Sequence, residues 1–350
     1  MTTSLSYFWK KKTLLSFVAV FFVIIIHNSA TKLYPPAMDT VSNLALGLRN
    51  FLAYDLGAVA VPLFFFLSGF ALFRDFSFKQ YGRKMRSRTK SLLIPYLFWN
   101  IFGMAVIILC TFTPLAKLVM GRELFNLSLH NFLEGIFLYK YNFQFWFMYD
   151  LIIYVVLTPV IYLLIRNKYL GGLAVVMALM LTLLTESFAF LNLNFTIFYV
   201  LGCFTGKHYL AHFAKPKSCR SALLAGLVAV TILIIRFLAI YEVIVLPIIV
   251  TQLLLVLLML SLWFFADLFV PRLKNKKYTA EFFPVYVLHT YFLAVFAKLI
   301  FFALPKNSYA LLVNEILSPI MTLVVVTTLS YWWHQKLNKS YNLLFGNRKD

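Results

Sequence analysis

The stretch KKKTLLSFVAVFFVIIIHNSA, residues 10–30, places three lysines before a mainly apolar run that ends in a histidine, His27. A helix needs about 20 apolar residues to cross the hydrocarbon core of a membrane, and this run is close to that length. It lacks the small-residue pattern at which a secretory signal is cleaved. The stretch therefore predicts a first membrane-spanning helix that follows basic residues and carries an imidazole near its far end.

The rest of the chain is similarly apolar. Of its 350 residues, 62% are hydrophobic and 18% are aromatic, and the mean hydropathy is +0.84. Such a composition excludes an ordinary water-soluble domain and is typical of a polytopic membrane protein. We predict an all-α membrane helical bundle that forms one domain over residues 1–350. Ten spans are expected, at about 13–30, 56–73, 91–112, 145–165, 170–186, 194–211, 222–240, 243–268, 281–302 and 316–334.

The distribution of charge supports this count. The formal net charge is +20, and 24 of the 32 Lys and Arg residues fall in segments that the ten spans place on one side, against 6 on the other. Such an asymmetry is typical of cytoplasmic loops, so the excess indicates membrane topology and no nucleic-acid partner. Both termini are predicted to be cytoplasmic. The three cysteines show neither disulfide nor metal-ligand spacing; they are Cys110, Cys203 and Cys219.

Ionisable residues within the predicted spans mark a candidate site, because charge is costly in hydrocarbon. His27 lies about 14 residues from the cytoplasmic edge of its span, or about 21 Å at ~1.5 Å per residue. Asp150 and Arg236 lie at a similar depth, and His289 lies near the middle of its span. The pattern predicts a polar chamber that opens outward. In the alternative reading, the histidines are only hydrogen-bonded to neighbouring helices, and Asp150 and Arg236 are counter-ions.

The segment 74–90, RDFSFKQYGRKMRSRTK, carries seven basic residues and one acid. We read it as a cytoplasmic loop. It either binds anionic lipid or holds a phosphorylated ligand through Arg83, Arg86 and Arg88, whose guanidinium groups match phosphate in two-point contacts.

Five motifs follow one another along the chain. They are FFVIIIHNSA at 21–30, VPLFFFLSGFALF at 61–73, RKMR at 83–86 followed by LLIPYLFW, FWFMYDLIIYVVLTP at 145–159 and FFPVYVLHTYF at 282–292. In this order and spacing they resemble the acyltransferase-3 family of integral-membrane O-acyltransferases. The resemblance runs from about residue 10 to residue 335, and ten helices with a cytoplasmic N-terminus also fit it.

The resemblance implies an acyl donor, usually acetyl-CoA, that enters from the cytoplasm as a substrate and not as a permanently bound cofactor. It implies a glycan or glycolipid acceptor and a bacterial cell membrane. By the motifs, His27 corresponds to the essential first-helix histidine, and Arg83 and Arg86 correspond to the donor-binding pair. The remaining matched positions are Ser68, Gly69, Trp146, Tyr149 and His289.

Two positions depart from the family pattern. Many members carry a basic residue eleven positions before the histidine, where this chain has Ser16, and some carry a histidine where it has Gln144. The absence of an extra-membrane domain resembles the short branch that acts on secreted or lipid-linked exopolysaccharide. These departures leave the acceptor and the acyl group open.

The chemistry of acyl transfer assigns the roles. A histidine whose pKa lies near ~6.5 suits removal of a proton from a sugar hydroxyl at neutral pH, so we expect His27 to act as general base. Asp150 either orients His27 or pairs with Arg236. Asn28, Ser29, Tyr149 and backbone amides are the candidate donors to the oxyanion. The alternative is a transporter or flippase, which ten helices with buried charges also suit, although no matched pair of broken helices is evident.

Overall fold

The computed structural model describes residues 2–34, 39–111, 128–184, 187–188, 191–272 and 277–346. The chain divides into two compact units, here described separately: unit 1 comprises residues 1–76 and 160–332, and unit 2 comprises residues 77–159 and 333–350. Several residues counted in the predicted spans and in the charge balance lie outside the described residues; they are residues 112, 185 and 186, Lys117, Arg122, Lys274, Lys276, Arg348 and Lys349.

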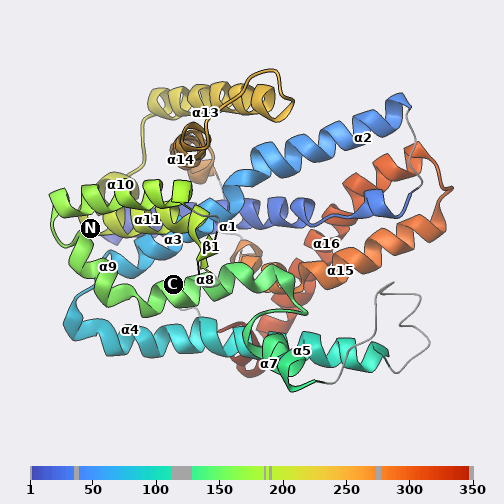
Figure 1. Cartoon of the computed structure of the whole chain (residues 1–350), viewed down its shortest axis with the longest axis horizontal. Coiled ribbons are helices and arrows are strands. Elements are labelled where there is room, and N and C mark those ends of the chain that lie inside the picture. The colour runs from blue at the N-terminus through green and yellow to red at the C-terminus, as the bar shows by residue number, and fades with distance from the viewer. Residues whose placement is uncertain are drawn as a thin grey trace. The chain divides into compact units, whose positions relative to one another are not determined.

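Unit 1 contains most of the helices labelled in Figure 1. They are α1 (Thr2–Ile26), α2 (Thr40–Asn50), α3 (Ala60–Phe73), α9 (Thr158–Ile165), α10 (Lys168–Leu184), α11 (Thr196–His208), α12 (Leu210–Ala214), α13 (Cys219–Ile240), α14 (Ile248–Phe265), α15 (Phe282–Ala303) and α16 (Ser308–Lys336). Two strands of two residues each, β1 (Ser187–Phe188) and β2 (Leu191–Asn192), pair antiparallel between α10 and α11.

Unit 2 is smaller. Its helices are α4 (Tyr81–Arg88), α5 (Ile94–Thr111), α7 (Leu129–Phe137), α8 (Trp146–Val156) and α17 (Asn338–Phe345). The π-helical segment Thr89–Leu93 joins α4 to α5 without a break. The predicted loop 74–90 is therefore helical over α4. The sequence offers the reason, because Lys, Arg and Met are good helix formers and no helix breaker follows Gly82 before Pro95.

Seven helical runs in the described residues are long and apolar enough to cross a membrane. They are Leu5–Lys32, Thr40–Phe73, Phe78–Thr111, Cys219–Ile240, Ile248–Arg272, Thr279–Ala303 and Ser308–Lys336. An eighth results if Phe143–Val156 and Thr158–Ile165, which are broken at Leu157, count as one span. These findings confirm a helical, multi-pass membrane protein. The count of ten spans and the cytoplasmic placement of both termini stay predictions.

Several helix boundaries differ from the predicted ones. The first helix begins at Thr2 and not at residue 13, because Lys11 is buried and paired inside the protein. The predicted span 194–211 corresponds to α11, which has 13 residues. At ~1.5 Å per residue such a helix is about 20 Å long, shorter than the ~30 Å hydrocarbon core.

The core of unit 1 depends on close packing between α3 and α11. Gly202 and Gly206 lie four residues apart on α11, and a Cβ atom at Gly202 would lie 2.1 Å from the carbonyl oxygen of Phe66 on α3. A Cβ at Gly69 on α3 would lie 2.5 Å from the carbonyl oxygen of Tyr199. Small residues at this spacing let two membrane helices approach backbone to backbone.

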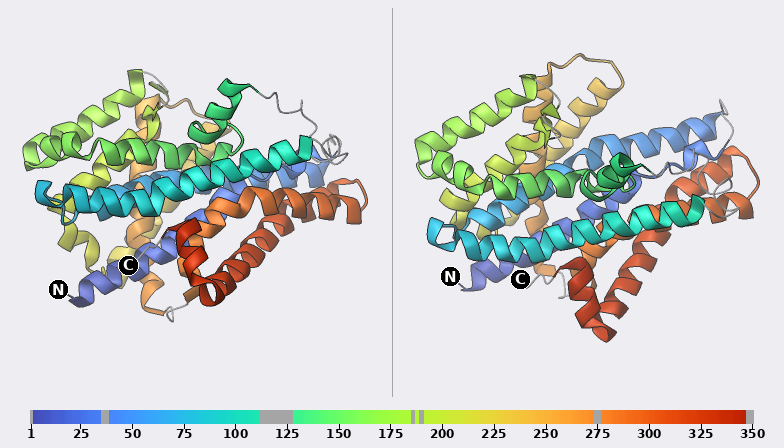
Figure 2. Two further views of the ribbon diagram at one scale, coloured as in Figure 1. Left: turned by 90° about the horizontal axis from the view of Figure 1, so that it is seen from below. Right: turned by 60° about the horizontal axis from the view of Figure 1, so that its bottom comes forward.

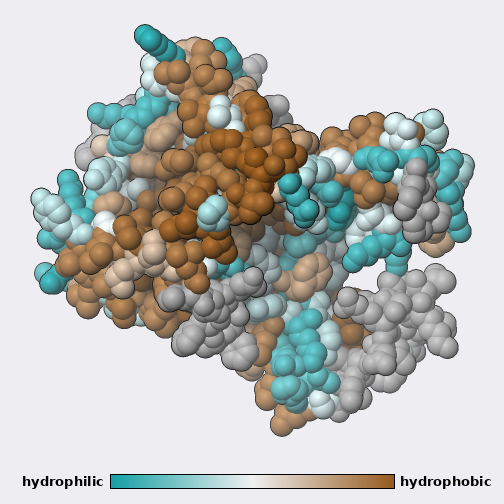
Figure 3. All heavy atoms as spheres, turned by 45° about the horizontal axis from the view of Figure 1, so that its top comes forward, coloured by the Kyte–Doolittle hydropathy of each residue, from teal (hydrophilic) through white to brown (hydrophobic). Residues whose placement is uncertain are grey.

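Other faces of unit 1 present apolar side chains outward. On α13 the exposed residues include Leu223, Leu227, Val230 and Ile234, and on α10 they include Leu173, Val176 and Met177. Figure 3 shows extensive hydrophobic surface, coloured brown, on the face that it presents. Exposed apolar surface on this scale suits contact with lipid.

Candidate functional site

The first-helix histidine lies directly against a second histidine. His27 follows the last residue of α1, and its ring stacks on that of His289 in α15, with 5.2 Å between ring centroids and 29° between ring planes. The two helices run side by side within unit 1, as the dark-blue and orange ribbons of Figure 2 show. The structure thus brings together two of the histidines that the motifs selected.

His289 is fully buried, and its surroundings define its protonated nitrogen. Its Nδ1 lies 2.6 Å from the carbonyl oxygen of Tyr286, which can only accept a hydrogen bond, so Nδ1 carries a proton. In the neutral ring Nε2 is then an acceptor, and it has no hydrogen-bond partner among the described residues. His289 therefore offers one unused acceptor beside the half-buried His27.

A buried polar network fixes the end of α1 next to His27. The side-chain amide of Asn28 donates to Glu315 Oε2 at 2.8 Å, and the backbone N–H of Thr31 donates to Glu315 Oε1 at 3.2 Å. Arg49, on α2, donates from Nη2 to the carbonyl oxygen of Asn28 at 3.2 Å, and its Nε lies 3.9 Å from Glu315 Oε2. Because its amide is directed at Glu315, Asn28 serves to position the chain at His27.

The N-terminal half of α1 is held by an ion pair. Lys11 Nζ lies 2.8 Å from Asp267 Oδ1, and both side chains are fully buried. The same carboxylate accepts hydrogen bonds from the Tyr7 hydroxyl at 2.7 Å and from the backbone N–H of Lys217 at 3.2 Å. The ammonium group also lies 4.6 Å from the ring centre of Trp263. α1 is therefore anchored by buried polar contacts at Lys11, within the helix, and beside its C-terminal end.

Asp150 lies in unit 2, in α8, and is almost fully buried. Its charge acts on three tyrosines, Tyr96, Tyr139 and Tyr149. Burial, reinforced by Asp150 and Tyr149, raises the pKa of Tyr139, so its phenol stays protonated at neutral pH. Tyr139 also adopts a left-handed backbone with φ of 50°, which is uncommon outside glycine and gathers at functional sites. Tyr149, a predicted site residue, is thus part of a tyrosine cluster around Asp150.

Arg236 has a different carboxylate neighbour from the one considered in the sequence. It lies near the end of α13 in unit 1, where Asp55 is the carboxylate whose charge acts on it. Its Nη2 donates to the carbonyl oxygen of Tyr54 at 3.1 Å. Asp150 belongs to the other unit, and its predicted role in orienting His27 stays a prediction.

The remaining predicted residues lie on three helices. Arg83 and Arg86 are exposed on α4 of unit 2, three residues apart and so on one face, and Arg88 is half-buried on the same helix. Ser68 is half-buried on α3 beside Gly69, which packs on α11. Trp146 is half-buried in the first turn of α8.

Sequence reasoning missed Glu315, Arg49 and Asp55. Glu315 lies one residue before the predicted span 316–334, and Arg49 was assigned to an outer loop, so neither was counted as a membrane residue. A charge at the edge of an apolar run is the only sequence signal that they give. The polar network at His27 becomes visible when α2 and α16 are seen to pack against the end of α1.

Comparison with known families adds a further observation. Residues 14–334 match the model of the acyltransferase-3 family, which is described as an acyltransferase domain. The chain belongs to the acyltransferase-3 family. No curated protein and no solved structure was found to match it. The match spans His27, the arginines of α4, Asp150 and His289, whereas Tyr7 and Lys11 lie just before its first residue.

Proposed function

We propose that this acyltransferase-3 protein transfers an acyl group, most simply acetyl, from acyl-CoA to a hydroxyl group of a surface or lipid-linked glycan at a bacterial cell membrane. The observation that carries the proposal is the stacked pair of His27 and His289, at the end of a membrane helix that two buried polar networks hold in place. Acyl transfer requires a base for the attacking hydroxyl, and imidazole suits that task at neutral pH.

The reaction follows from the chemistry of the imidazole. His27 accepts the proton of the acceptor hydroxyl as its oxygen attacks the thioester carbonyl. The tetrahedral intermediate then collapses, the carbon–sulfur bond breaks, and the proton passes from the imidazolium to the leaving thiolate. No external oxidant or metal is needed for this balance. As the sequence predicts, Asp150 is proposed to support the base and Tyr149 to donate a hydrogen bond to the oxyanion.

The donor side of the proposal rests on α4. Arg83 and Arg86 are exposed on one face of this helix, and Arg88 lies two residues further along. Their guanidinium groups suit the phosphates of CoA. The bilayer supplies the environment of the protein, and no nucleic acid is involved. A transporter is the weaker proposal, because membership of an acyltransferase family favours group transfer.

The direct test is cleavage and transfer of labelled acetyl-CoA by the purified protein in liposomes. We expect His27→Ala to lower the rate by ~10²–10⁴, as loss of a general base does. His130→Ala is the matched control, since this histidine lies in α7 with its side chain 79% exposed. Undiminished activity of His27→Ala would overturn the assignment of the base.

A second test addresses the donor site. The double variant Arg83→Ala with Arg86→Ala should weaken acetyl-CoA binding about tenfold or more, since a hydrogen bond to a charged group contributes ~1.5–3 kcal/mol. Arg166→Ala removes another exposed arginine and serves as the control. Equal binding by the double variant and the control would refute the role of α4.

A further inference from the structure

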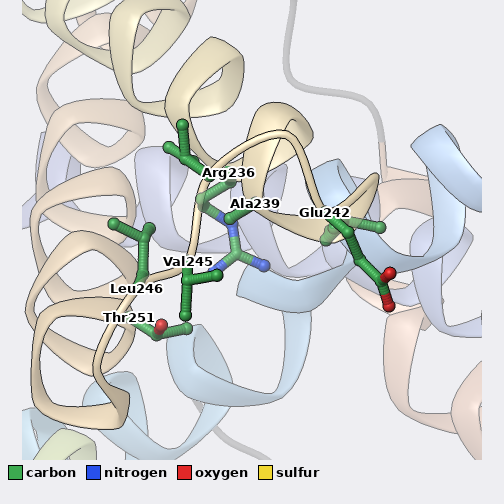
Figure 4. Close-up of a pocket in the computed structure, with 8 residues that line it drawn as sticks. Arg236, Ala239, Glu242, Val245, Leu246 and Thr251 are labelled. Carbon is green, nitrogen blue, oxygen red and sulfur yellow. The ribbon is translucent and has the colours of Figure 1, made fainter.

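A cavity lies at the C-terminal end of α13 in unit 1. Its volume is about 570 Å³, and half of its lining residues come from the turn between α13 and α14. The lining residues are Arg236, Ala239, Ile240, Glu242, Ile244, Val245, Leu246 and Thr251, of which six are labelled in Figure 4. The charge pattern of the sequence predicts that this end of α13 faces away from the cytoplasm.

Arg236 is the buried polar group in the cavity wall. Only 8% of its surface is exposed, yet it makes one hydrogen bond, to the carbonyl of Tyr54, and its Nε has no partner among the described residues. An arginine carries five N–H donors. A buried donor without an acceptor costs free energy, so this guanidinium is arranged to receive an acceptor group.

The neighbouring charges define the ligand class. Asp55 lies in the π-helical segment Phe51–Leu56, is fully buried, and offsets the charge of Arg236 although neither of its oxygens has a hydrogen-bond partner among the described residues. Glu242 also lines the cavity, but its carboxylate is directed away from Arg236. Because Asp55 already offsets the charge of Arg236, the site gives an anionic headgroup little net attraction. A hydroxyl group, which accepts a hydrogen bond without carrying a charge, suits the unused donor of Arg236.

The rim of the cavity is apolar. Val245 lines it and is 94% exposed, and Ile240 is exposed on the last turn of α13. In Figure 4 the guanidinium of Arg236 lies beside Val245, and the carboxylate of Glu242 points away from it. A site with a polar base and an exposed apolar rim suits an amphiphile whose headgroup enters and whose chains stay in lipid.

The helical run 40–59 connects this cavity with His27. Arg49 on α2 contacts the carbonyl of Asn28, the residue after His27, and Tyr54 in the π-helical segment accepts the hydrogen bond from Arg236. The run 40–59 also packs on α1, because a Cβ at Gly57 would lie 3.2 Å from the side chain of Ile26. π-Helical segments are frequent at functional sites. The run 40–59 therefore contacts both the polar network beside His27 and the guanidinium of Arg236.

We propose that the Arg236 cavity binds an uncharged sugar headgroup of a membrane-embedded glycolipid, the acceptor class. This inference rests on the proposed function for its meaning, but its test measures binding alone. The probe is monoglucosyl diacylglycerol, added to the full-length protein in a non-glycosidic detergent, with bound lipid counted by native mass spectrometry. Phosphatidylglycerol with the same acyl chains is the anionic comparator.

The variants separate binding from folding. Val245→Trp fills the cavity from an exposed position and should weaken glucolipid binding at least tenfold, as should Arg236→Gln. Val243→Trp is the matched control, because Val243 lies in the same turn, is 67% exposed and does not line the cavity. Glucolipid binding that is equal in Val245→Trp and Val243→Trp would overturn the proposal, and so would preferential, Val245-dependent binding of phosphatidylglycerol.

Failure of the proposed function gives a different result. Acetyl-CoA binding is measured on the same preparations without acceptor. Absence of acetyl-CoA binding by the unmodified protein would refute the acyl-transfer proposal and leave the lipid-binding comparison intact. Acetyl-CoA binding by the unmodified protein, together with glucolipid binding that Val245→Trp does not change, would refute only the sugar site.

Discussion

The ion pair between Lys11 and Asp267 allows a quantitative test of how α1 is anchored. The perturbation is Asp267→Ala, which leaves the ammonium group of Lys11 buried without its carboxylate. Removal of one partner of a buried ion pair costs ~3–5 kcal/mol. The Tyr7 hydroxyl and the backbone N–H of Lys217 also lose their acceptor, at ~0.5–1.5 kcal/mol each. The ring of Trp263 remains under the cation and recovers up to ~2 kcal/mol. We therefore expect a net loss of about 4 kcal/mol.

The complementary variant is Lys11→Met, which leaves Asp267 with two hydrogen-bond donors. Its cost should be smaller, about 2–3 kcal/mol, since the remaining charge is still solvated by Tyr7 and the Lys217 amide. The double variant removes both charges, so its cost should fall short of the sum of the two single costs by about 2 kcal/mol or more, as contacting residues do in a double-mutant cycle.

The assay is reversible unfolding in mixed detergent and dodecyl sulfate micelles, followed by circular dichroism. Lys215→Met, which removes an exposed lysine before α13, is the control and should change the free energy of unfolding by less than ~0.5 kcal/mol. Additive costs in the double variant, or an Asp267→Ala cost no larger than that of the control, would refute the reasoning, because the pair would then not be desolvated.

Three further predictions test other parts of the fold and site. Gly202→Ala should prevent native packing of α3 on α11, because its Cβ would lie 2.1 Å from a backbone oxygen. The control is Gly172→Ala, whose Cβ would meet nothing within 4 Å. This control should be neutral or stabilising by up to ~1 kcal/mol in the same unfolding assay. Glu315→Gln keeps the shape of the network beside His27 but removes its charge, and should lower kcat about tenfold while leaving the KM for acetyl-CoA unchanged. The hydrogen bonds that the Ser308 hydroxyl and the backbone N–H of Ser42 donate to Asp39 lower the pKa of this carboxyl from its usual 3.8. The ionised Asp39 therefore contributes stability above pH 3.8 that is lost as the pH falls through the lowered pKa. In Asp39→Asn, this loss of stability below pH 3.8 should disappear from a plot of the free energy of unfolding against pH. The same fall in stability in the variant and in the unmodified protein would contradict the prediction.

The positions of the helices could be predicted from the sequence because apolar length alone determines which segments enter a membrane. Each of the ten predicted spans falls on a helix or a helix pair of the structure. The predicted positions of the helix ends were less accurate. Hydropathy places an end where charge appears, but Lys11 and Glu315 are charged residues that lie inside their helices and are buried by pairing.

The candidate site could be predicted only in part. The motifs selected His27 and His289, yet spacing along the chain does not show that the two rings stack. The partners of Arg236 and Asn28 are determined by the run 40–59, which the sequence divides between a loop and a span. Its π-helical segment shifts the hydrogen-bond register, and no residue pattern in FLAYDL signals such a shift.

The way in which α1 is anchored explains why these missed residues matter. Between Lys12 and His27 the helix is apolar on nearly every side, so burial against lipid-like neighbours does little to choose one rotation over another. Its two polar anchors, at Lys11 and at Asn28, lie 17 residues apart, or about 26 Å along a helix. Two fixed points at this separation set both the height and the rotation of α1. Ser16 is buried between them. The direction of the imidazole at His27 is therefore determined by the ion pair at Lys11 and by the polar network at Asn28, and Asp267→Ala should change activity as well as stability.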